Sequence, residues 1–503
     1  MERRIANQPL FLLLAGIGAA AMFVPAIHAL ANERHHEARA FFYSGLLGLI
    51  IVTLIAVARD SIPRRYREMR NLAALFAAFA FLPLMLAVPF HEALRTTTFL
   101  NAYAEMVSAL TTTGMPHFEP ERLSSTLHLW RAMVGWMGGL LVWVAAASIL
   151  APLSLGGFEV TATAEPGQGE RLSQFALVDP QRRIIRTALR LVPIYGGLTA
   201  ILWVLLIILG EVPLVAACHA MSTLSTSGIS PVGGVQNASA GYAGEGLIAL
   251  FMLFALSRLT FSNDTLTSAR PGILRDPEFR LGMMIVIGVP LILFLRHWIG
   301  AYEVSSERTV TDAIAALWGG LFTVLSFLTT TGFESAAWHS ARDWSGMPTP
   351  GLIFLGLAII GGGVATTAGG VKLLRVWVLY LNGVREMERM IHPSSVGRSG
   401  AQNRRFRRKG AFVAWIFFML FAMTLALLML VLAAFGADFE TATVLAIAAL
   451  ANTGPLVSAA PEFPIVLAEL GDGARMALVA GMVLGRLEML AIIALLTTET
   501  WRD

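Results

Sequence analysis

The chain has 503 residues, of which 56% are hydrophobic and 14% are charged, and its mean hydropathy is +0.67. Soluble domains carry about 25% charged residues, so this composition excludes a soluble globular protein and indicates an integral membrane protein. The single cysteine, Cys218, excludes an intramolecular disulfide and a cysteine-based metal cluster.

Apolar runs recur along the chain at lengths that suit membrane-spanning helices, which need about 20 residues. The runs do not alternate as barrel strands do, so the expected fold class is an all-α polytopic membrane protein. The first run is too long for the apolar core of a signal peptide, and a retained span is expected there. The ten expected spans are 10–30, 41–57, 72–90, 132–155, 189–209, 246–259, 281–295, 352–363, 411–435 and 474–496.

Basic residues cluster in alternate connections between these runs. The clusters lie at 64–70, 171–190, 270–280 and 375–409, whereas 229–250 and 454–473 contain neither Lys nor Arg. Cytoplasmic loops of membrane proteins carry the excess of positive charge, so both termini and the basic loops are expected in the cytoplasm. The sequence pI of about 9.5 therefore reflects membrane orientation, and no nucleic-acid partner is expected.

One polar sequence motif occurs four times among the apolar runs, and all four copies are expected on the non-cytoplasmic side of the membrane. Each copy of the motif ends at a glycine, and successive glycines are separated by 114, 104 and 122 residues, which indicates duplication of a domain-sized unit. Each unit is expected to contain a span, an apolar helix too short to cross the membrane, the polar turn and a second span. The expected parts are an extra N-terminal helix pair (1–63) and four pseudo-fourfold repeats (64–155, 156–270, 271–398 and 399–503). The four copies of the motif read SALTTTG (108–114), STLSTSG (222–228), SFLTTTG (326–332) and AALANTG (448–454).

The four turns together favour an ion filter. Irregular backbone at membrane depth is tolerated only where protein or water surrounds it, and glycine permits backbone conformations that are closed to other residues. Four such turns around one central pore would make rings of carbonyl oxygens, as in potassium filters, and the threonine hydroxyls would add a ring of neutral oxygens. For a single turn the alternative is a helix cap with back-bonded Ser or Thr; four copies at matching offsets favour the filter.

Several other polar residues stand out within the apolar runs. Arg486 lies inside the last run, where inserting an ionisable side chain into the membrane costs at least ~2.5 kcal/mol. Such a residue indicates a function; the alternatives are a structural ion pair and a side chain that extends to the cytoplasmic surface. Glu488 is expected on another face of that helix. Glu105 and His219, nine residues before their glycines, are expected to give hydrogen-bonded support. Glu334 either raises the cation density at the outer mouth or is simply solvated.

A glycine-rich stretch, 361–370, interrupts the eighth run. Close helix packing is one explanation of these glycines, whereas a nucleotide-binding loop is excluded because Lys372 lacks the preceding glycine that such loops require.

These features resemble the Trk/Ktr/HKT superfamily of cation transporters, and most closely its bacterial TrkH branch. The resemblance rests on the four turns, the N-terminal helix pair and the motifs GGGVATTAGGVKLLR (361–375), RDPEFR (275–280), REMERMIHP (385–393) and LGRLEML (484–490). It implies that K⁺ binds at the four turns, and that the glycine-rich stretch is an intramembrane gate loop with Arg486 facing the pore beside it, bonded to loop carbonyls.

The residues implied by the resemblance fall into a filter and a gate. Gly114 favours potassium over sodium, whereas Pro455, Asn452 and the serines of the second turn depart from the family pattern. The implied filter residues are Thr111, Thr112, Thr113, Gly114, Ser225, Thr226, Ser227, Gly228, Thr329, Thr330, Thr331, Gly332, Ala451, Asn452, Thr453 and Gly454. The implied gate residues are Gly361, Gly362, Gly363, Thr366, Thr367, Gly369, Gly370 and Arg486.

The resemblance also implies a function and partners. It implies potassium uptake across the bacterial inner membrane by a homodimer with one pore per protomer, in contact with membrane lipid. A cytoplasmic TrkA-type subunit would bind ATP or NAD, and this chain itself is expected to need no cofactor. No nucleophile–base arrangement is present, so no enzyme is expected. The alternatives are a sodium-permeable or nonselective channel of the same fold, an ion-coupled symporter, for which inverted repeats would be typical, and a non-transporting receptor.

Overall fold

The computed structural model describes residues 8–58, 68–153, 155–158, 180–257, 273–299, 310–346, 350–392, 408–488 and 491–492. Within these ranges every regular element is a helix, which confirms the expected all-α fold class. The basic residues at 64–67, 171, 270, 398 and 404–407, which belong to the loops predicted to be cytoplasmic, lie outside the described ranges.

Eight of the described helices are long and apolar enough to cross a membrane. Their outward faces carry large exposed apolar side chains such as Leu54, Leu189 and Leu430, as expected for surfaces in contact with lipid. The eight helices are Leu10–Ala31, His35–Ala58, Arg70–Leu94, Ser125–Leu150, Pro180–Ile208, Pro277–Arg296, Val310–Leu328 and Gly410–Ala434.

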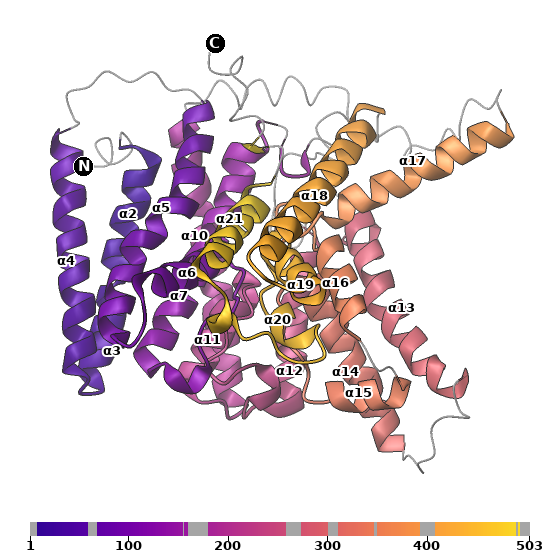
Figure 1. Cartoon of the computed structure of the whole chain (residues 1–503), viewed down its shortest axis with the longest axis horizontal. Coiled ribbons are helices and arrows are strands. Elements are labelled where there is room, and N and C mark those ends of the chain that lie inside the picture. The colour runs from indigo at the N-terminus through magenta and orange to yellow at the C-terminus, as the bar shows by residue number, and fades with distance from the viewer. Residues whose placement is uncertain are drawn as a thin grey trace.

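The N-terminal pair lies at one side of the molecule (Figure 1). It consists of α2 (Leu10–Ala21) continued by α3 (Phe23–Ala31), and of α4 (His35–Ala58). Both α2 and α4 pack against α5 (Glu68–Leu94), the first helix of the first repeat. Small residues permit this close approach: a Cβ on Gly48 would lie 2.9 Å from the Ala19 side chain.

Each repeat contributes an outer helix, a pore helix that ends at the polar turn, and a return helix. The first repeat contains α5, α6 (Phe99–Leu110) and α7 (Ser125–Ala145), and the second contains α10 (Pro180–Ile208), α11 (Pro213–Ser225) and α12 (Gly241–Met252). The third contains α13 (Pro277–Ile299), α14 (Val310–Leu328), α15 (Trp338–Ser345), α16 (Gly351–Ile360) and α17 (Leu373–Ile391). The fourth contains α18 (Arg408–Ala434), α19 (Phe439–Leu450), α20 (Leu456–Ala459) and α21 (Asp472–Leu487).

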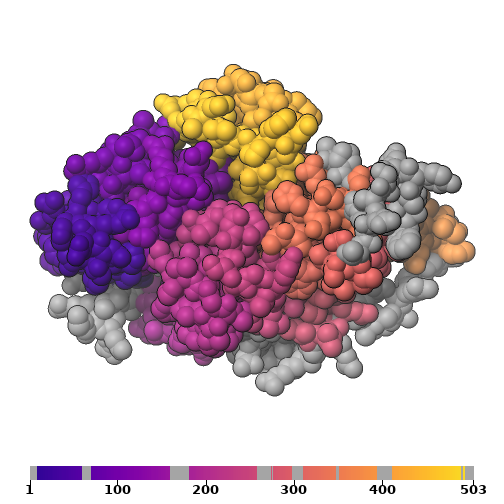
Figure 2. Space-filling view, turned by 90° about the horizontal axis from the view of Figure 1, so that it is seen from below, coloured from indigo at the N-terminus to yellow at the C-terminus, as the bar shows by residue number. Residues whose placement is uncertain are grey.

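The four repeats close into a ring. Helix α7 packs on α11, α12 on α14, α16 on α19, and α21 returns to α6 of the first repeat. Figure 2 shows the same arrangement as successive purple, magenta, salmon and yellow sectors, with the indigo N-terminal pair outside them. Since each pore helix is held between its own repeat and the preceding one, with α6 of the first repeat packed on α21 of the fourth, the four polar turns are brought to the centre of the ring.

Some helix lengths differ from the sequence prediction. The expected sixth and eighth spans are short apolar helices, Gly241–Leu256 and Gly351–Ile360, and the last, α21, has 16 residues. Helix α16 ends where Gly361 takes φ +71°, and α21 ends where Glu488 takes φ +62°. The expectation that every pore helix is too short to cross a membrane is wrong for α14, which has 19 residues and is apolar apart from its first turn, which carries Asp312.

Candidate functional site: four polar turns and a glycine-rich loop

The four polar turns share one backbone conformation. The residue two before the glycine is left-handed in every copy, with φ of +54° at Thr112, +52° at Thr226, +58° at Thr330 and +52° at Asn452. The following amide donates back to the pore helix each time, as in Thr113 N to Ser108 O at 2.9 Å, with the corresponding bonds at 3.0, 2.9 and 2.9 Å. The four helices therefore end in the same way, although their sequences differ.

The turns meet one another at the glycines. Gly114 and Gly228 have φ of +67° and Gly332 has +80°, conformations that favour glycine. A Cβ on Gly114 would lie 1.6 Å from Ser227 O, and one on Gly228 would lie 2.2 Å from Thr331 O. No larger residue fits where the backbones of neighbouring turns approach this closely.

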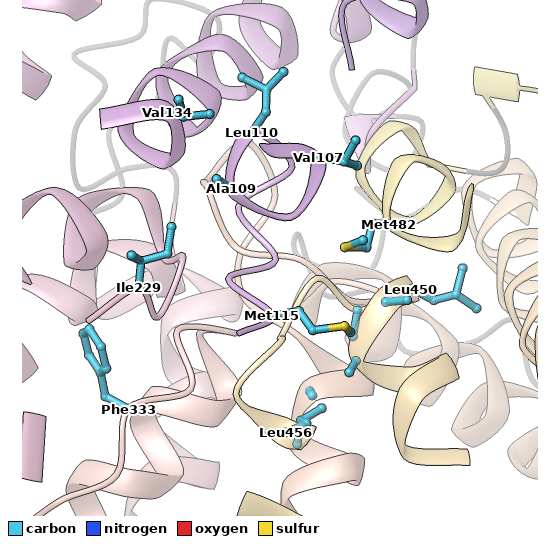
Figure 3. Close-up of a cluster of buried hydrophobic side chains, with 14 of the residues drawn as sticks. Val107, Ala109, Leu110, Met115, Val134, Ile229, Phe333, Leu450, Leu456 and Met482 are labelled. Carbon is cyan, nitrogen blue, oxygen red and sulfur yellow. The ribbon is translucent and has the colours of Figure 1, made fainter. Parts of the chain in front are cut away.

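The side chains that follow the turns are buried and apolar. Met115, Ile229 and Phe333 come directly after the first three glycines and are at most 2% exposed. In Figure 3 they lie with Leu456 and Met482 in the hydrophobic packing around the turns. This hydrophobic packing supports the turns.

The serine six residues before the glycine supports the turn in two repeats. Ser108 Oγ accepts from Met115 N at 2.7 Å, and Ser326 Oγ accepts from Phe333 N at 2.6 Å. The fourth repeat has Ala448 at this position, and its Gly454 N instead donates to Thr113 O of the first turn at 2.6 Å. The fourth turn is thus held by the first turn through Gly454 N, in addition to the bond from Thr453 N to its own pore helix.

Most of the hydroxyls of the turns bond within their own turns, and a ring of hydroxyl oxygens around the pore stays a prediction. Thr111 Oγ1 donates to Val107 O at 2.8 Å and lies 2.8 Å from Thr113 Oγ1. The third turn has the equivalent bonds, at 2.9 and 3.0 Å, and Ser225 of the second turn has them at 2.8 and 3.0 Å. Ser and Thr side chains near a helix end commonly donate hydrogen bonds to carbonyls of the same helix.

In the first two repeats, the residue nine positions before the glycine anchors the segment that leaves the turn. Glu105 accepts from His117 N at 3.1 Å and pairs with Arg131, and His219 Nε2 lies 2.8 Å from Ser230 Oγ. These bonds confirm the expected supporting roles of Glu105 and His219.

The anchor of the third repeat was not predicted from the sequence. The carboxylate of Glu245, on α12 of the second repeat, accepts from Trp318 Nε1 at 2.8 Å, Ser335 Oγ at 2.6 Å and Ala336 N at 2.7 Å. Glu245 is fully buried, so it joins the second repeat to the exit of the third turn. No local pattern around Glu245 reveals a partner 90 residues later in the chain.

Replacing Glu245 with alanine is expected to destabilise the folded protein. One buried and two partly buried donors lose their acceptor, at a cost of about 3 kcal/mol, and the apparent midpoint of thermal unfolding in detergent should fall by about 5 °C. Glu386→Ala is the matched control, because its carboxylate forms an exposed ion pair with Arg389, and its midpoint should stay within about 1 °C of the parent. An unchanged midpoint for Glu245→Ala would contradict the anchoring role.

Glu334 lies directly after the third turn and is partly buried. Burial raises the pKa of this carboxyl, while the neighbouring His339 and Arg342 lower it. Both alternatives for Glu334, an effect on cation density at the outer mouth and simple solvation of a partly exposed carboxyl, stay predictions.

The glycine-rich stretch forms a closed loop between α16 and α17. Val371 N donates to Ile359 O at 2.8 Å, Lys372 N to Ile360 O at 2.9 Å, and Leu373 N to Gly362 O at 3.0 Å. The predicted interruption of the eighth run is therefore confirmed. A Cβ on Gly361 would lie 2.2 Å from Gly369 O, so the crossing at the base of the loop requires glycine.

The loop lies directly against the inner ends of the pore helices. Gly369 N donates to Thr330 Oγ1 at 2.7 Å, and Thr367 Oγ1 donates to Leu224 O at 3.1 Å. A Cβ on Gly369 would lie 2.0 Å from Ala451 O of the fourth turn. The loop thus contacts the second, third and fourth repeats at the level where their pore helices end.

A cavity separates part of the loop from the second repeat. Hydroxyl groups of the second repeat and of the loop line it, together with aromatic and aliphatic side chains, most of them from the second repeat. The lining residues are Trp143, Tyr195, Thr223, Leu224, Thr226, Phe251, Phe254, Ala255, Ser257, Ala365, Thr366 and Thr367.

Arg486 lies on α21 in the same region and is 6% exposed. Tyr195 and Glu488 are its electrostatic neighbours, and within the described ranges its Nε and Nη2 have no hydrogen-bond partner. The expected bonds to loop carbonyls are therefore wrong for these two atoms; the Ala368 carbonyl accepts from Lys372 Nζ instead. Within the described ranges, Arg486 is therefore a buried side chain with two unpartnered donor atoms and with Glu488 as its acidic neighbour.

Comparison with known proteins places this architecture in a family. Residues 272–500 match the family model TrkH, described as a cation transport protein. The chain is 32% identical to the Trk system potassium uptake protein TrkI of Halomonas elongata over 96% of this chain and 94% of the relative. The chain belongs to the TrkH family.

Other TrkH-family proteins agree in sequence and structure. The TrkH protein of Escherichia coli is 30% identical over 81% of this chain and 80% of its own length. The crystal structure of the potassium transporter TrkH from Vibrio parahaemolyticus covers 100% of both chains, with a TM-score of 0.80 and 26% identity. Family membership together with eight long apolar helices makes this chain a multi-pass membrane protein.

Proposed function

We propose that this protein carries K⁺ into the cell through a gated pore whose filter is formed by the four polar turns. The observation that carries the proposal is the meeting of four equivalent backbone turns at Gly114, Gly228, Gly332 and Gly454. The relatives that match most of the chain are named potassium uptake proteins, which supports K⁺ as the transported ion.

The chemistry of the turns suits a dehydrated cation. Four pore helices, α6, α11, α14 and α19, end at the turns, and helix C-termini carry partial negative charge. The turn sequences contain no acidic residue, so backbone carbonyls replace the water shell of the ion, as in potassium filters. The proposed ion-binding residues remain those of the four turns, 111–114, 225–228, 329–332 and 451–454.

The glycine-rich loop and Arg486 form the proposed gate. The loop lies against three of the four pore-helix ends, and the buried Arg486 adds positive charge beside it. Positive charge in a region of low dielectric repels a passing cation. Ions pass when the loop moves, which the small residues Gly369 and Ala368 permit.

The proposed setting is the bacterial inner membrane, with both termini in the cytoplasm. We propose a homodimer in which each protomer has its own pore, surrounded by membrane lipid. A cytoplasmic TrkA-type subunit would bind ATP or NAD and regulate the gate. These proposals follow from the family to which the chain belongs and from the distribution of basic residues.

Growth at low potassium tests the proposed function. The protein should rescue bacteria that lack their own potassium uptake systems when external K⁺ is limiting, whereas an empty vector should not. A normally expressed protein that fails to rescue, with its cytoplasmic subunit present, would contradict potassium uptake and favour a non-transporting receptor. Flux in liposomes that requires a proton or sodium gradient would instead support an ion-coupled symporter.

A further inference from the structure

The first half of the glycine-rich loop is held by the start of α13. Val364 N donates to Glu278 Oε1 at 3.0 Å, and the adjacent Gly363 N donates to Ala255 O at 2.9 Å. Next to these contacts, Ser257 Oγ donates to the carboxylate of Asp276. Glu278 is 2% exposed, so its carboxylate is buried beside the loop backbone.

The second half of the loop is held by the end of α21. Arg375 Nη1 donates to Val371 O at 3.3 Å, and Arg375 Nη2 pairs with Glu488 Oε2 at 2.6 Å. The guanidinium of Arg375 also lies over the Phe417 ring at 3.7 Å. Glu488 therefore fixes the loop through Arg375, and it can do so because α21 ends there with Glu488 at φ +62°.

These two carboxylates do not take part in the four polar turns. Glu278, from α13, accepts from Val364 N near one end of the loop, 361–372, whereas Glu488, at the end of α21, reaches the other end through Arg375 of α17. Buried carboxylates are costly unless they are hydrogen-bonded or paired. The bond from Val364 N to Glu278 and the pair of Arg375 with Glu488 exist only while the loop and the base of α17 keep their present positions.

Building on the proposed gate, we propose that Glu278 and Glu488 are positioning residues that latch the glycine-rich loop in its blocking position from its two ends. Opening the gate then requires the Val364–Glu278 bond or the Arg375–Glu488 pair to lengthen. Arg486 lies on the same last turn of α21 as Leu487 and the latch residue Glu488, so release of Glu488 also frees the charged end of that helix.

Ion flux through purified protein in liposomes tests the latch. Glu488→Gln and Glu278→Gln keep the side-chain shape but remove the charge, and each should raise K⁺ flux about tenfold, which corresponds to about 1.4 kcal/mol in the gating equilibrium. The ratio of K⁺ to Na⁺ permeability should stay at the parent value, because the turns are untouched. Glu386→Gln, in the exposed pair with Arg389 on α17, is the matched control and should leave the flux unchanged.

A second readout follows the loop itself. In a background with Cys218→Ala, the probe Ala365→Cys, in the loop and lining the cavity, should react with a cytoplasmic thiol reagent several times faster when Glu278→Gln or Glu488→Gln is present. A role in overall folding alone would lower flux and expression without raising this reaction rate.

The two proposals fail in different ways. A parent protein that conducts K⁺, together with glutamine variants that match it in flux and in labelling rate, would overturn the latch and leave the proposed function intact. A parent protein that conducts no K⁺, with or without its cytoplasmic subunit, would overturn the proposed function itself; faster labelling in the variants would then still support a latched loop.

Discussion

Replacing Gly114 with alanine is expected to lower K⁺ uptake at least about a hundredfold, a change of about 2.7 kcal/mol. The new Cβ would lie 1.6 Å from Ser227 O, so the backbone of the second turn has to move. Alanine at φ +67° adds strain of about 1–2 kcal/mol. Uptake of K⁺ or its congener Rb⁺ by cells expressing equal amounts of each variant measures the effect.

The control for this prediction separates backbone strain from contact between the turns. Gly346 has φ +60°, close to that of Gly114, but no heavy atom of the described structure lies within 4 Å of its added Cβ. Gly346→Ala should therefore keep uptake within about twofold of the parent. If Gly114→Ala transported K⁺ as well as Gly346→Ala, the turns would not form a constriction at that glycine.

Replacing Arg486 with alanine is expected to raise K⁺ flux about tenfold or more. A unit charge roughly 8 Å from a cation costs about 2 kcal/mol at an effective dielectric of about 20, which is about thirtyfold in rate. Arg486 is buried and lacks hydrogen-bond partners at Nε and Nη2 within the described residues, so its removal breaks no bond at those atoms. Single-channel current or liposome flux at fixed protein density measures the change.

Arg475→Ala is the control on the same helix. Arg475 lies in the first turn of α21, where it bonds Asp472 and the Ala468 carbonyl, and its loss should leave flux near that of the parent. Unchanged or lower flux for Arg486→Ala, at normal expression, would contradict the barrier role and make Arg486 a structural residue.

The four turns could be predicted from the sequence because the pattern is repeated. Each copy carries the same small and polar residues at fixed offsets, and duplication preserves the local backbone, as the matching φ of Thr112, Thr226, Thr330 and Asn452 shows. The extra N-terminal pair and the break at Gly361 could be predicted for a different reason, because the length of an apolar run and the presence of glycine determine structure locally.

The contacts between repeats could not be predicted. Asn452 donates to Thr113 Oγ1 at 2.9 Å and to Met482 O at 3.0 Å, so the departure in the fourth turn joins it to the first turn and to α21. The partners are 339 and 30 residues away in sequence. Sequence periodicity does not indicate that the Asn452 side chain bonds the first turn and α21, because those contacts depend on how the four repeats close into a ring.

The contacts of Arg375 and Glu488 beside the loop could not be predicted from the sequence either. Ideal helix geometry separates Glu488 from Arg486, as expected, but it does not indicate that the helix ends at Glu488 or that Arg375 lies beside it. Arg375 reads as one more basic residue near the cytoplasmic side, whereas it is fully buried between Glu488 and Phe417.

The reversal potential of the purified protein in a planar bilayer, with K⁺ on one side and Na⁺ on the other, tests the central claim most directly. If the four turns form a potassium filter, the current should reverse near the potassium equilibrium potential, and Glu488→Gln should increase the current without moving that potential. A reversal near the sodium equilibrium potential, or near zero, would contradict the claim and identify a sodium-permeable or nonselective pore.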